Sequence, residues 1–353
     1  MHIYNSEQWM KDIYEVSYNL SELEALAGKS IMITGAAGLI CSSVVDILLQ
    51  YNETHEAPIK IFAAGRSIEK IRERFGPSCH KEYFKFIKYD ALKSDNLEVL
   101  ADYVIHGAGN AFPRMIVEEP VETMISNFCG MFHLLNAAKI HKTNRILYLS
   151  SSEVYGERKE KHQYQEKDYG YIDILNPRNA YSMGKRATET LCISYAYEFD
   201  TEVVIVRPGH IYGPTASLKD DRVSSSFAYA AACGKDIVLK SDGAQVRSYT
   251  YCLDCAAAIL KVLVKGKNLH AYNISNPDSI ISIKQMAEIL AKASGVSLIQ
   301  EEANETEKKG FNPMSNSSLD GTKLMNLGWK SCFNAEKGLA HTVKILKEMK
   351  EKN

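Results

Sequence analysis

A tyrosine and a lysine stand four residues apart, at Tyr181 and Lys185. In a helix this spacing places both side chains on one face, about one turn apart. A phenol has a pKa of about 10, so it serves as a base near neutral pH only where a cation stabilises the phenolate, and Lys185 can supply that cation. The pair predicts proton transfer to or from a substrate oxygen, although the same spacing also occurs in ordinary helix packing.

Three serines and a glutamate follow an apolar run, in the segment Leu149-Ser-Ser-Ser-Glu-Val-Tyr-Gly156. The apolar run is typical of a buried strand, and hydroxyls at its end can bind the substrate oxygen that Tyr181 protonates or deprotonates. Two interpretations of Glu153 stay open: a catalytic carboxylate, or a structural carboxylate that caps a turn.

Two glycines, Gly35 and Gly38, separate an apolar run from a helical pattern. Gly35 permits a tight turn, Gly38 lets the backbone approach a pyrophosphate, and the helix N-terminus offers free N–H donors. An ordinary strand-to-helix turn is the alternative, but this position in the chain favours a dinucleotide site. Cys41 occupies the place where a third glycine or alanine usually lets helix and strand pack closely, and we expect at most a slight displacement of the helix.

The segment Ala63-Ala-Gly-Arg-Ser67 ends the next predicted strand and bears on the choice of nicotinamide cofactor. NAD-binding proteins usually have an acidic residue here, which accepts hydrogen bonds from the adenosine ribose. This chain has none; Arg66 can stack on the adenine and hold a 2′-phosphate, with Ser67 as a further donor. NADP(H) is therefore favoured, with NAD(H) as the alternative if Arg66 is only a solvated turn residue.

Strand and helix patterns alternate around these residues. We expect strands over 29–34, 59–64, 83–88, 103–106, 145–149 and 202–207, and helices over 40–49, 68–75, 118–140 and 179–198. This alternation predicts an α/β fold with a doubly wound parallel sheet, the Rossmann arrangement.

Three regions follow from the patterns. Residues 1–27 form an N-terminal helical extension with one helix over 6–27, and 28–207 form the cofactor-binding domain. Residues 208–353 form mainly a smaller α/β substrate-binding lobe, from which a segment of about 246–275 returns to the first domain. Helices are expected near 224–234, 254–265, 282–294 and 335–350, and no linker separates the lobes.

Composition narrows the function classes. The 353 residues carry 42 basic and 43 acidic side chains, a formal charge of −1, which predicts neither nucleic-acid nor membrane binding. The eight cysteines lack the spacing of a metal site, so we expect none. No signal peptide or membrane-spanning run is present, and we expect a cytoplasmic protein.

Several motifs in order resemble one family. They are Gly-x-x-Gly at the first strand, Ser-Ser-Glu-Val-Tyr-Gly, Tyr-x-x-x-Lys, Arg207-Pro-Gly-His-Ile-Tyr-Gly-Pro214 and Val246-Arg-Ser-Tyr followed by Asp254. Over roughly residues 28–345 the chain resembles the extended short-chain dehydrogenase/reductase family, whose members are nucleotide-sugar epimerases, dehydratases, decarboxylases and reductases.

The resemblance implies roles for particular positions. Ser151, Tyr181 and Lys185 match the catalytic residues, and Glu153 lies beside the substrate. The implied cofactor contacts are Gly35, Ala37, Gly38, Leu39, Ile40, Asp90, Ala108, Asn127, Ser150 and Pro208, together with Tyr181 and Lys185, whose ammonium can bind the nicotinamide ribose. The implied substrate contacts are Ser152, His210, Arg222 and Arg247, of which Arg247 matches a residue that clamps the diphosphate of a nucleotide sugar. His210 stands where the family often has asparagine.

Two activities remain open within this family. The 4,6-dehydratases usually have aspartate where this chain has Ser152, which argues against dehydration. The serine motif looks most like the UDP-glucuronate decarboxylase branch, but that branch usually has arginine after Gly213-Pro214, so a uronate carboxylate would need Arg178 or Arg222. An epimerase or decarboxylase regenerates its cofactor in place, commonly NAD, whereas Arg66 favours a net NADPH-dependent reductase of a nucleotide-linked keto sugar.

The resemblance also bears on assembly and on pathway. The helices over 118–140 and 179–198 resemble the pair that forms a four-helix dimer interface in this family, so we expect a homodimer. The expected partner is a nucleotide-diphosphate sugar, used to make surface polysaccharide precursors. A Rossmann protein that only senses NADP(H) is the remaining alternative, and the intact Ser151, Tyr181 and Lys185 argue against it.

Overall fold

A seven-stranded parallel sheet forms the centre of the computed structural model, which describes residues 2–93, 97, 101–159, 162–302 and 314–351. The strands are β1 (Ser30–Thr34), β2 (Lys60–Gly65), β3 (Phe84–Lys88), β4 (Tyr103–His106), β5 (Arg145–Leu149), β6 (Val203–Pro208) and β10 (Ala271–Ile274). Their order is β10-β6-β5-β4-β1-β2-β3, and every neighbouring pair is parallel. The doubly wound α/β fold is thereby confirmed.

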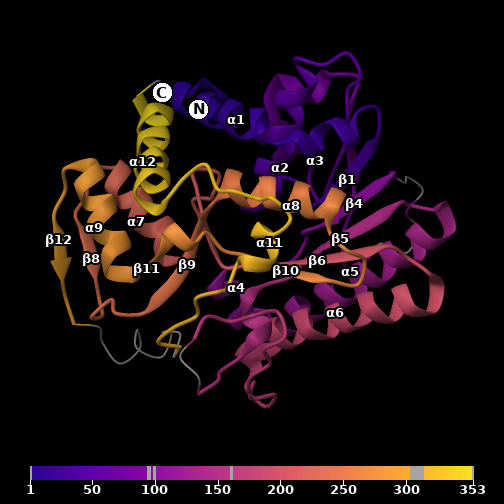
Figure 1. The fold of residues 1–353 in the computed structure, drawn as a ribbon. Helices are drawn as coiled ribbons and strands as arrows, with labels where there is room; N and C mark the ends of the chain where they lie inside the picture. The colour runs from indigo at the N-terminus through magenta and orange to yellow at the C-terminus, as the bar shows by residue number, and fades with distance from the viewer. Residues whose placement is uncertain (1, 94–96, 98–100, 160–161, 303–313, 352–353) are drawn as a thin grey trace.

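Helices cover both faces of this sheet, which is why the central strands β1, β4, β5 and β6 are mostly apolar and buried. On one face lie α2 (Leu39–Asn52) and α8 (Cys252–Lys265), and on the other lie α5 (Pro120–His141) and α6 (Ala180–Phe199) (Figure 1). The strand order reverses at β1, because β2 and β3 follow on one side of it and β4, β5 and β6 on the other, so a crevice opens at the carboxyl ends of β1 and β4. Helix α3 (Ile68–Phe75) follows β2 beside this crevice.

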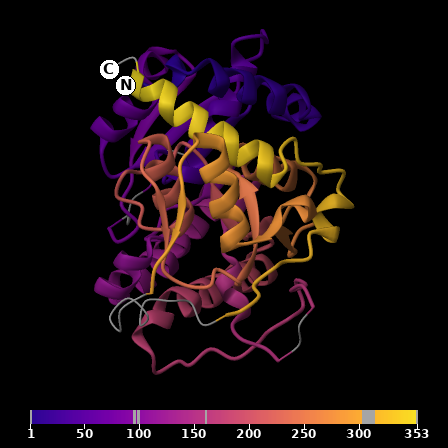
Figure 2. The same ribbon diagram turned by 90° about the vertical axis from the view of Figure 1, so that its left-hand side faces the viewer.

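A smaller α/β lobe lies to one side of the sheet (Figures 1 and 2). It contains a three-stranded sheet of β7 (His210–Tyr212), β9 (Val246–Tyr251) and β11 (Ile280–Ser282), and a two-stranded sheet of β8 (Ile237–Leu239) and β12 (Leu298–Gln300). Its helices are α7 (Val223–Ala232), α9 (Ile283–Ser294) and α12 (Ala335–Glu351), with the short α11 (Thr322–Met325) against β10. Between β9 and β11 the chain returns to the large sheet as α8 and β10.

The expected helix over 6–27 is wrong in one respect, because it is broken. Helix α1 spans Glu7–Tyr18, and a 3₁₀ helix follows over Ser21–Leu26. Asn19 ends α1, because its side-chain amide donates to the Glu15 carbonyl and competes with the helix. The apolar residues of both pieces are buried, as expected, and α1 packs against α2, α8 and α12.

The expected helix over 118–140 is confirmed as α5, which begins two residues later than expected, and a short helix that was not expected precedes it. A short α4 spans Pro113–Glu118, and α5 begins at Pro120. Glu119 between them is not helical, with φ −130° and ψ 57°, because a residue that precedes proline is disfavoured from the helical conformation.

Candidate active site

A cavity of about 930 Å³ lies at the carboxyl ends of β1, β2 and β4. Eight of the residues expected to bind the cofactor line it: Gly35, Ala37, Gly38, Leu39, Arg66, Ser67, Asp90 and Ala108. The cavity also has walls that the sequence reasoning missed, among them Lys70, Gly107, Gly109, Phe112, Glu122 and Thr215. Gly107 and Gly109 could have been identified from the sequence, because they belong to a Gly-Ala-Gly string directly after the buried strand β4.

The turn after β1 has the geometry that a pyrophosphate requires. Gly35 has φ +70°, and a Cβ there would lie 2.9 Å from the Gly107 carbonyl oxygen, so only glycine fits. Gly38 is the N-cap of α2, and no side chain caps that helix end. The first N–H groups of α2 are thus left for an anionic ligand. Ile40 lies in this first turn, outside the cavity lining.

Cys41 packs against Gly107, which explains how the helix accommodates a side chain larger than alanine. A Cβ on Gly107 would lie 2.3 Å from the Cys41 Sγ atom. Cys41 stands where a smaller residue is usual, and the absence of a side chain at Gly107 leaves room for its Sγ atom. The two positions are therefore sterically coupled.

This coupling gives a first prediction. Gly107→Ala is expected to cost about 1–3 kcal/mol in the free energy of unfolding and to weaken nicotinamide cofactor binding, because α2 must move outward. The double variant with Cys41→Ala should regain most of both losses, measured by urea unfolding and calorimetric titration. Equal losses in the single and double variants would contradict the coupling.

The remaining expected cofactor residues lie around this groove. Asn127 is buried on α5; its Oδ1 accepts from the Tyr148 hydroxyl at 3.3 Å, and its amide lies against Gly109. Ser150 is buried and its hydroxyl has no partner among the described residues. Pro208 ends β6 and is buried outside the cavity lining.

Tyr181 lies in the first turn of α6 and is 8% exposed. Burial raises its pKa to about 12, and the Glu153 carboxylate adds to the rise, while a hydrogen bond from Ser151 and the charge of Arg222 oppose it. The phenol is therefore protonated at neutral pH in this state. Burial and the charge of Glu153 therefore dominate this balance, and the role of Lys185 as the cation that stabilises the phenolate stays a prediction.

Lys185 is held against the sheet beside the tyrosine. Its Nζ donates to the Leu149 carbonyl at 2.7 Å and lies 5.7 Å from the Tyr181 ring centre and 4.8 Å from that of Tyr148. Burial lowers its pKa to about 7. The contact with Leu149 anchors the ammonium at the end of β5, on the sheet edge that carries the cofactor groove.

Replacing Lys185 with methionine should abolish activity and still stabilise the fold. The unfolded lysine holds its proton up to about pH 10.5 and the folded one only to about 7, so the cost of burial is fully present below pH 7 and fades as the pH rises to 10.5. We expect Lys185→Met to gain about 1–3 kcal/mol at pH 6 in urea unfolding and almost nothing near pH 10. A loss of stability at pH 6 would contradict a burial cost at this lysine.

Glu153 is not a free carboxylate. Arg178 donates two hydrogen bonds to it, at 2.8 and 3.1 Å, and the Ser182 hydroxyl donates a third at 3.0 Å. Although burial raises the pKa of Glu153, the hydrogen bonds and charge of Arg178 outweigh burial and the net pKa is lowered. Glu153 therefore stays ionised beside Tyr181 and acts as a fixed negative charge.

The expected substrate residues differ in burial and in how many of their hydrogen-bonding groups already have partners. Arg247 is 3% exposed and donates only to the backbone carbonyls of Val246 and Met314 in the described part of the chain. Arg222 pairs with Asp220 through two side-chain nitrogens. His210 has a pKa lowered to about 4 by burial, and its Nδ1 has no described partner. Ser152 begins a 3₁₀ helix over Ser152–Tyr155 and is half-buried.

Arg66 and Ser67 lie at the far end of the groove. The Arg66 Nη1 atom is 3.5 Å from the Glu122 Oε1 atom across the cavity. The Ser67 hydroxyl accepts from the Lys70 N–H and donates to Glu69, so it caps α3. These bonds use the hydroxyl that was expected to serve as a phosphate donor.

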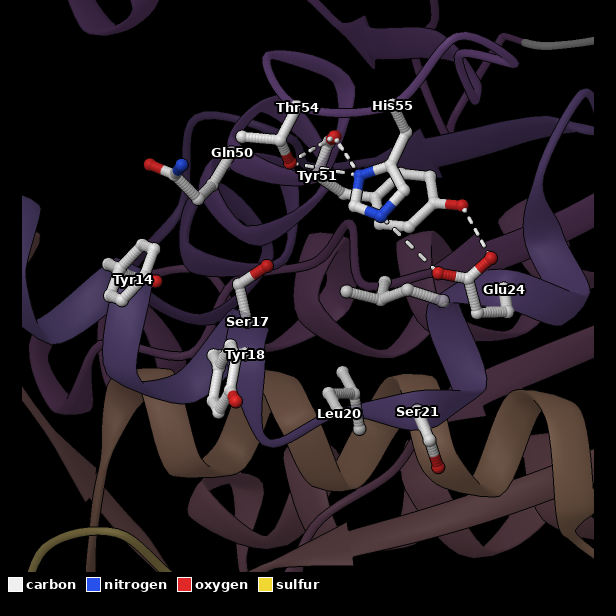
Figure 3. Close-up of a pocket in the computed structure, with 11 residues that line it drawn as sticks. Tyr14, Ser17, Tyr18, Leu20, Ser21, Glu24, Gln50, Tyr51, Thr54 and His55 are labelled. Carbon is white, nitrogen blue, oxygen red and sulfur yellow. Dashed lines mark hydrogen bonds and ion pairs between the residues drawn. The ribbon is translucent and has the colours of Figure 1, made fainter.

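A second cavity, of about 360 Å³, lies between the N-terminal extension and the C-terminal end of α2 (Figure 3). Glu24 accepts from the Tyr51 hydroxyl and pairs with His55, whose ring stacks on Tyr51 at 3.8 Å. These polar groups satisfy one another, so the contacts tie the extension to the helical layer of the sheet. No cluster of metal-ligating side chains occurs among the residues that the structure describes, and no helix in that part of the chain is long and apolar enough to cross a bilayer.

The groove, the glycine turn and the Tyr181 cluster define a nicotinamide-dependent enzyme of the extended short-chain type. Residues 31–275 match the model of the NAD-dependent epimerase/dehydratase family, and the chain belongs to that family. It is 32% identical over 254 residues to UDP-glucuronic acid decarboxylase 6 of Arabidopsis thaliana, covering 72% of this chain and 71% of that protein. UDP-glucuronic acid decarboxylase 1 of Xenopus tropicalis is 29% identical over 319 residues, covering 89% of this chain and 71% of that protein.

Solved structures agree with the fold. The UDP-glucuronic acid 4-epimerase of Bacillus cereus, determined with UDP-glucuronic acid and NAD, superposes with a TM-score of 0.77 at 24% identity, over 91% of this chain and 99% of that one. The resemblance stated from the motifs is thereby confirmed at the level of family and fold.

Proposed function

We propose that this enzyme acts on a nucleotide-diphosphate sugar, moving a proton at a sugar hydroxyl through Tyr181 while the nicotinamide ring exchanges hydride at the same carbon. The observation that carries this proposal is the buried Tyr181, whose pKa the Ser151 hydroxyl affects and whose ring centre lies 5.7 Å from the Lys185 Nζ atom, which is bonded to the end of β5. A phenol held in this way can donate a proton to a sugar oxygen and recover it in the reverse step.

Arg247 supports a diphosphate substrate. A buried guanidinium bonded only to backbone carbonyls in the described chain retains its charge and lacks a described counterion. A diphosphate would supply that counterion through charge-assisted hydrogen bonds. The decarboxylases to which the chain is similar act on a UDP-linked sugar by their names, which supports the same class of substrate here.

We favour an activity of the epimerase or decarboxylase kind, in which one substrate is oxidised and then reduced again. Ser152 stands where dehydration would need an acid, and the ionised Glu153 cannot donate a proton while Arg178 binds it. The second candidate is a net NADPH-dependent reduction of a nucleotide-linked keto sugar, which Arg66 at the adenosine end of the groove favours. Either product would suit the synthesis of surface polysaccharide precursors.

A panel of UDP-, CDP-, GDP- and dTDP-sugars, each with and without NADPH or NADH, distinguishes the two. Product mass without net change in the reduced-nicotinamide absorbance indicates an epimerase or decarboxylase, and stoichiometric loss of NADPH indicates a reductase. Cofactor binding with no turnover of any sugar, under conditions where a related decarboxylase is active, would favour a sensor and contradict the proposed enzyme.

NADP(H) is our proposed cofactor, with NAD(H) as the alternative. Arg66 and Lys70 both line the adenosine end of the groove and offer positive charge to a 2′-phosphate. The enzyme would act in the cytoplasm, which suits its eight unpaired cysteines.

We also propose a homodimer formed through α5 and α6. Helix α5 exposes apolar side chains along one face, namely Val121, Met124, Ile125, Phe128 and Phe132, and the adjacent α6 exposes Ile193 and Tyr197. A surface of this kind is typical of a protein–protein interface. It lies on the side of the sheet opposite α2 and α8, so a partner bound there would leave the cofactor groove open.

The dimer gives a further prediction. The wild type should elute as a dimer in size-exclusion chromatography with light scattering, and Phe128→Glu should give a folded monomer, because a charge buried in the interface costs several kcal/mol. Tyr18→Glu is the matched control, since Tyr18 is 79% exposed on α1, away from this surface. A monomeric wild type at micromolar concentration would contradict the proposal.

A further inference from the structure

Arg66 has an acidic partner across the cofactor groove. Glu122 lies in the first turn of α5, Arg66 in the turn after β2, and both line the cavity. Their closest side-chain atoms, Nη1 and Oε1, are 3.5 Å apart, with the side chains 66% and 34% exposed respectively. The pair therefore spans the adenosine end of the groove between two elements that the sequence separates by more than fifty residues.

The pair contributes little to the stability of the fold. An ion pair with this exposure is screened by solvent, and its contact is longer than a good charge-assisted hydrogen bond. A ligand can therefore break it at small cost. The significance of Glu122 lies in where it holds the guanidinium and in the negative charge that it brings to the nucleotide site.

A 2′-phosphate would compete with Glu122. Phosphate binds arginine through the same planar donors that a carboxylate uses, so Arg66 cannot serve both fully. Glu122 would also repel a dianionic phosphate at the mouth of the groove, whereas a ribose hydroxyl carries no charge and is not repelled. Lys70 lines the same end and offers a second positive charge, and Ser67 is occupied as the cap of α3.

We infer that Glu122 is a specificity-determining residue that opposes Arg66 and restricts the preference for NADP over NAD. The inference rests on the proposed role of Arg66 in binding the 2′-phosphate. Arg66 attracts the 2′-phosphate of NADP, and Glu122 competes with that phosphate for the guanidinium. The preference for NADP is therefore small enough that the same site can also bind NAD. Removing the carboxylate strengthens NADP binding and leaves NAD binding almost unchanged.

The test measures the binding of NADP⁺ and NAD⁺ by calorimetric titration to the wild type, Glu122→Gln, Arg66→Gln and the double variant. We expect Glu122→Gln to tighten NADP⁺ binding about 5- to 10-fold and to change NAD⁺ binding less than twofold. Arg66→Gln should weaken NADP⁺ binding about tenfold. In the double variant the gain from Glu122→Gln should shrink to about twofold or less, because the competition acts through Arg66.

Glu118→Gln is the matched control, since Glu118 is an exposed acid at the end of α4 that pairs with Arg114 and does not line the cavity. If Arg66→Gln weakens NADP⁺ binding but Glu122→Gln leaves the NADP⁺ affinity unchanged, or raises the NAD⁺ affinity equally, the inference about Glu122 is overturned. If Arg66→Gln leaves NADP⁺ binding unchanged, the proposed role of Arg66 fails first. A gain in the Glu118→Gln control equal to that of Glu122→Gln would assign the effect to net charge and overturn the inference.

Discussion

Replacing Tyr181 with phenylalanine is expected to lower kcat about 10³-fold while the protein still folds and binds its cofactor. Positioned acid–base groups contribute about 10²- to 10⁴-fold to a rate, and Tyr181 is the ionisable group whose pKa the Ser151 hydroxyl lowers against the effect of burial. The ring of the variant keeps the same volume in a site that is 8% exposed, so packing is preserved.

The measurement combines turnover of the substrate found in the sugar panel with calorimetric titration of the cofactor. Tyr18→Phe is the matched control, because Tyr18 is 79% exposed on α1 and lies outside both the active site and the proposed dimer surface. If Tyr181→Phe keeps more than about a tenth of wild-type turnover, Tyr181 is not the acid–base group. A variant that fails to bind cofactor would instead indicate a role in binding.

Replacing Arg247 with methionine is expected to weaken the binding of UDP or of the active nucleotide sugar by at least about 10²-fold. Hydrogen bonds from a desolvated guanidinium to phosphate are among the strongest in proteins, and burial lowers the pKa of Arg247 without removing its charge. Cofactor binding should stay within twofold of wild type, because Arg247 lies on β9 and does not line the dinucleotide cavity.

The free energy of unfolding distinguishes a ligand-binding role of Arg247 from a structural one. If the guanidinium serves a ligand, Arg247→Met removes a buried charge and the free energy of unfolding stays equal or rises. Arg247→Lys should recover part of the affinity, since it restores the charge without the planar fork. Arg72→Gln, an exposed change on α3, is the control. Unchanged UDP affinity in Arg247→Met would remove Arg247 from the substrate site.

The fold could be predicted because its signals are local. Strands β4 and β5 and helix α3 have the predicted bounds, since mostly apolar runs and helical periodicity are recognised within a few residues. The predicted helix over 6–27 was wrong at Asn19, where one side chain interrupts a longer apolar pattern. Hydrophobic periodicity indicates which face of a segment is buried, but it does not reveal where a helix ends and a second one begins.

The proposed catalytic pair, Tyr181 and Lys185, and the glycine turn were determined by the sequence itself, because i, i+4 spacing and a strand–turn–helix place their residues without help from the rest of the chain. Only the tertiary structure decided their surroundings. Glu153 binds Arg178, Cys41 packs on Gly107 and Arg66 meets Glu122 across separations of 25 residues or more, where spacing carries no information. Burial, which no single segment encodes, then set the charge states: it raised the pKa of Tyr181 and lowered that of Lys185 by removing both from water.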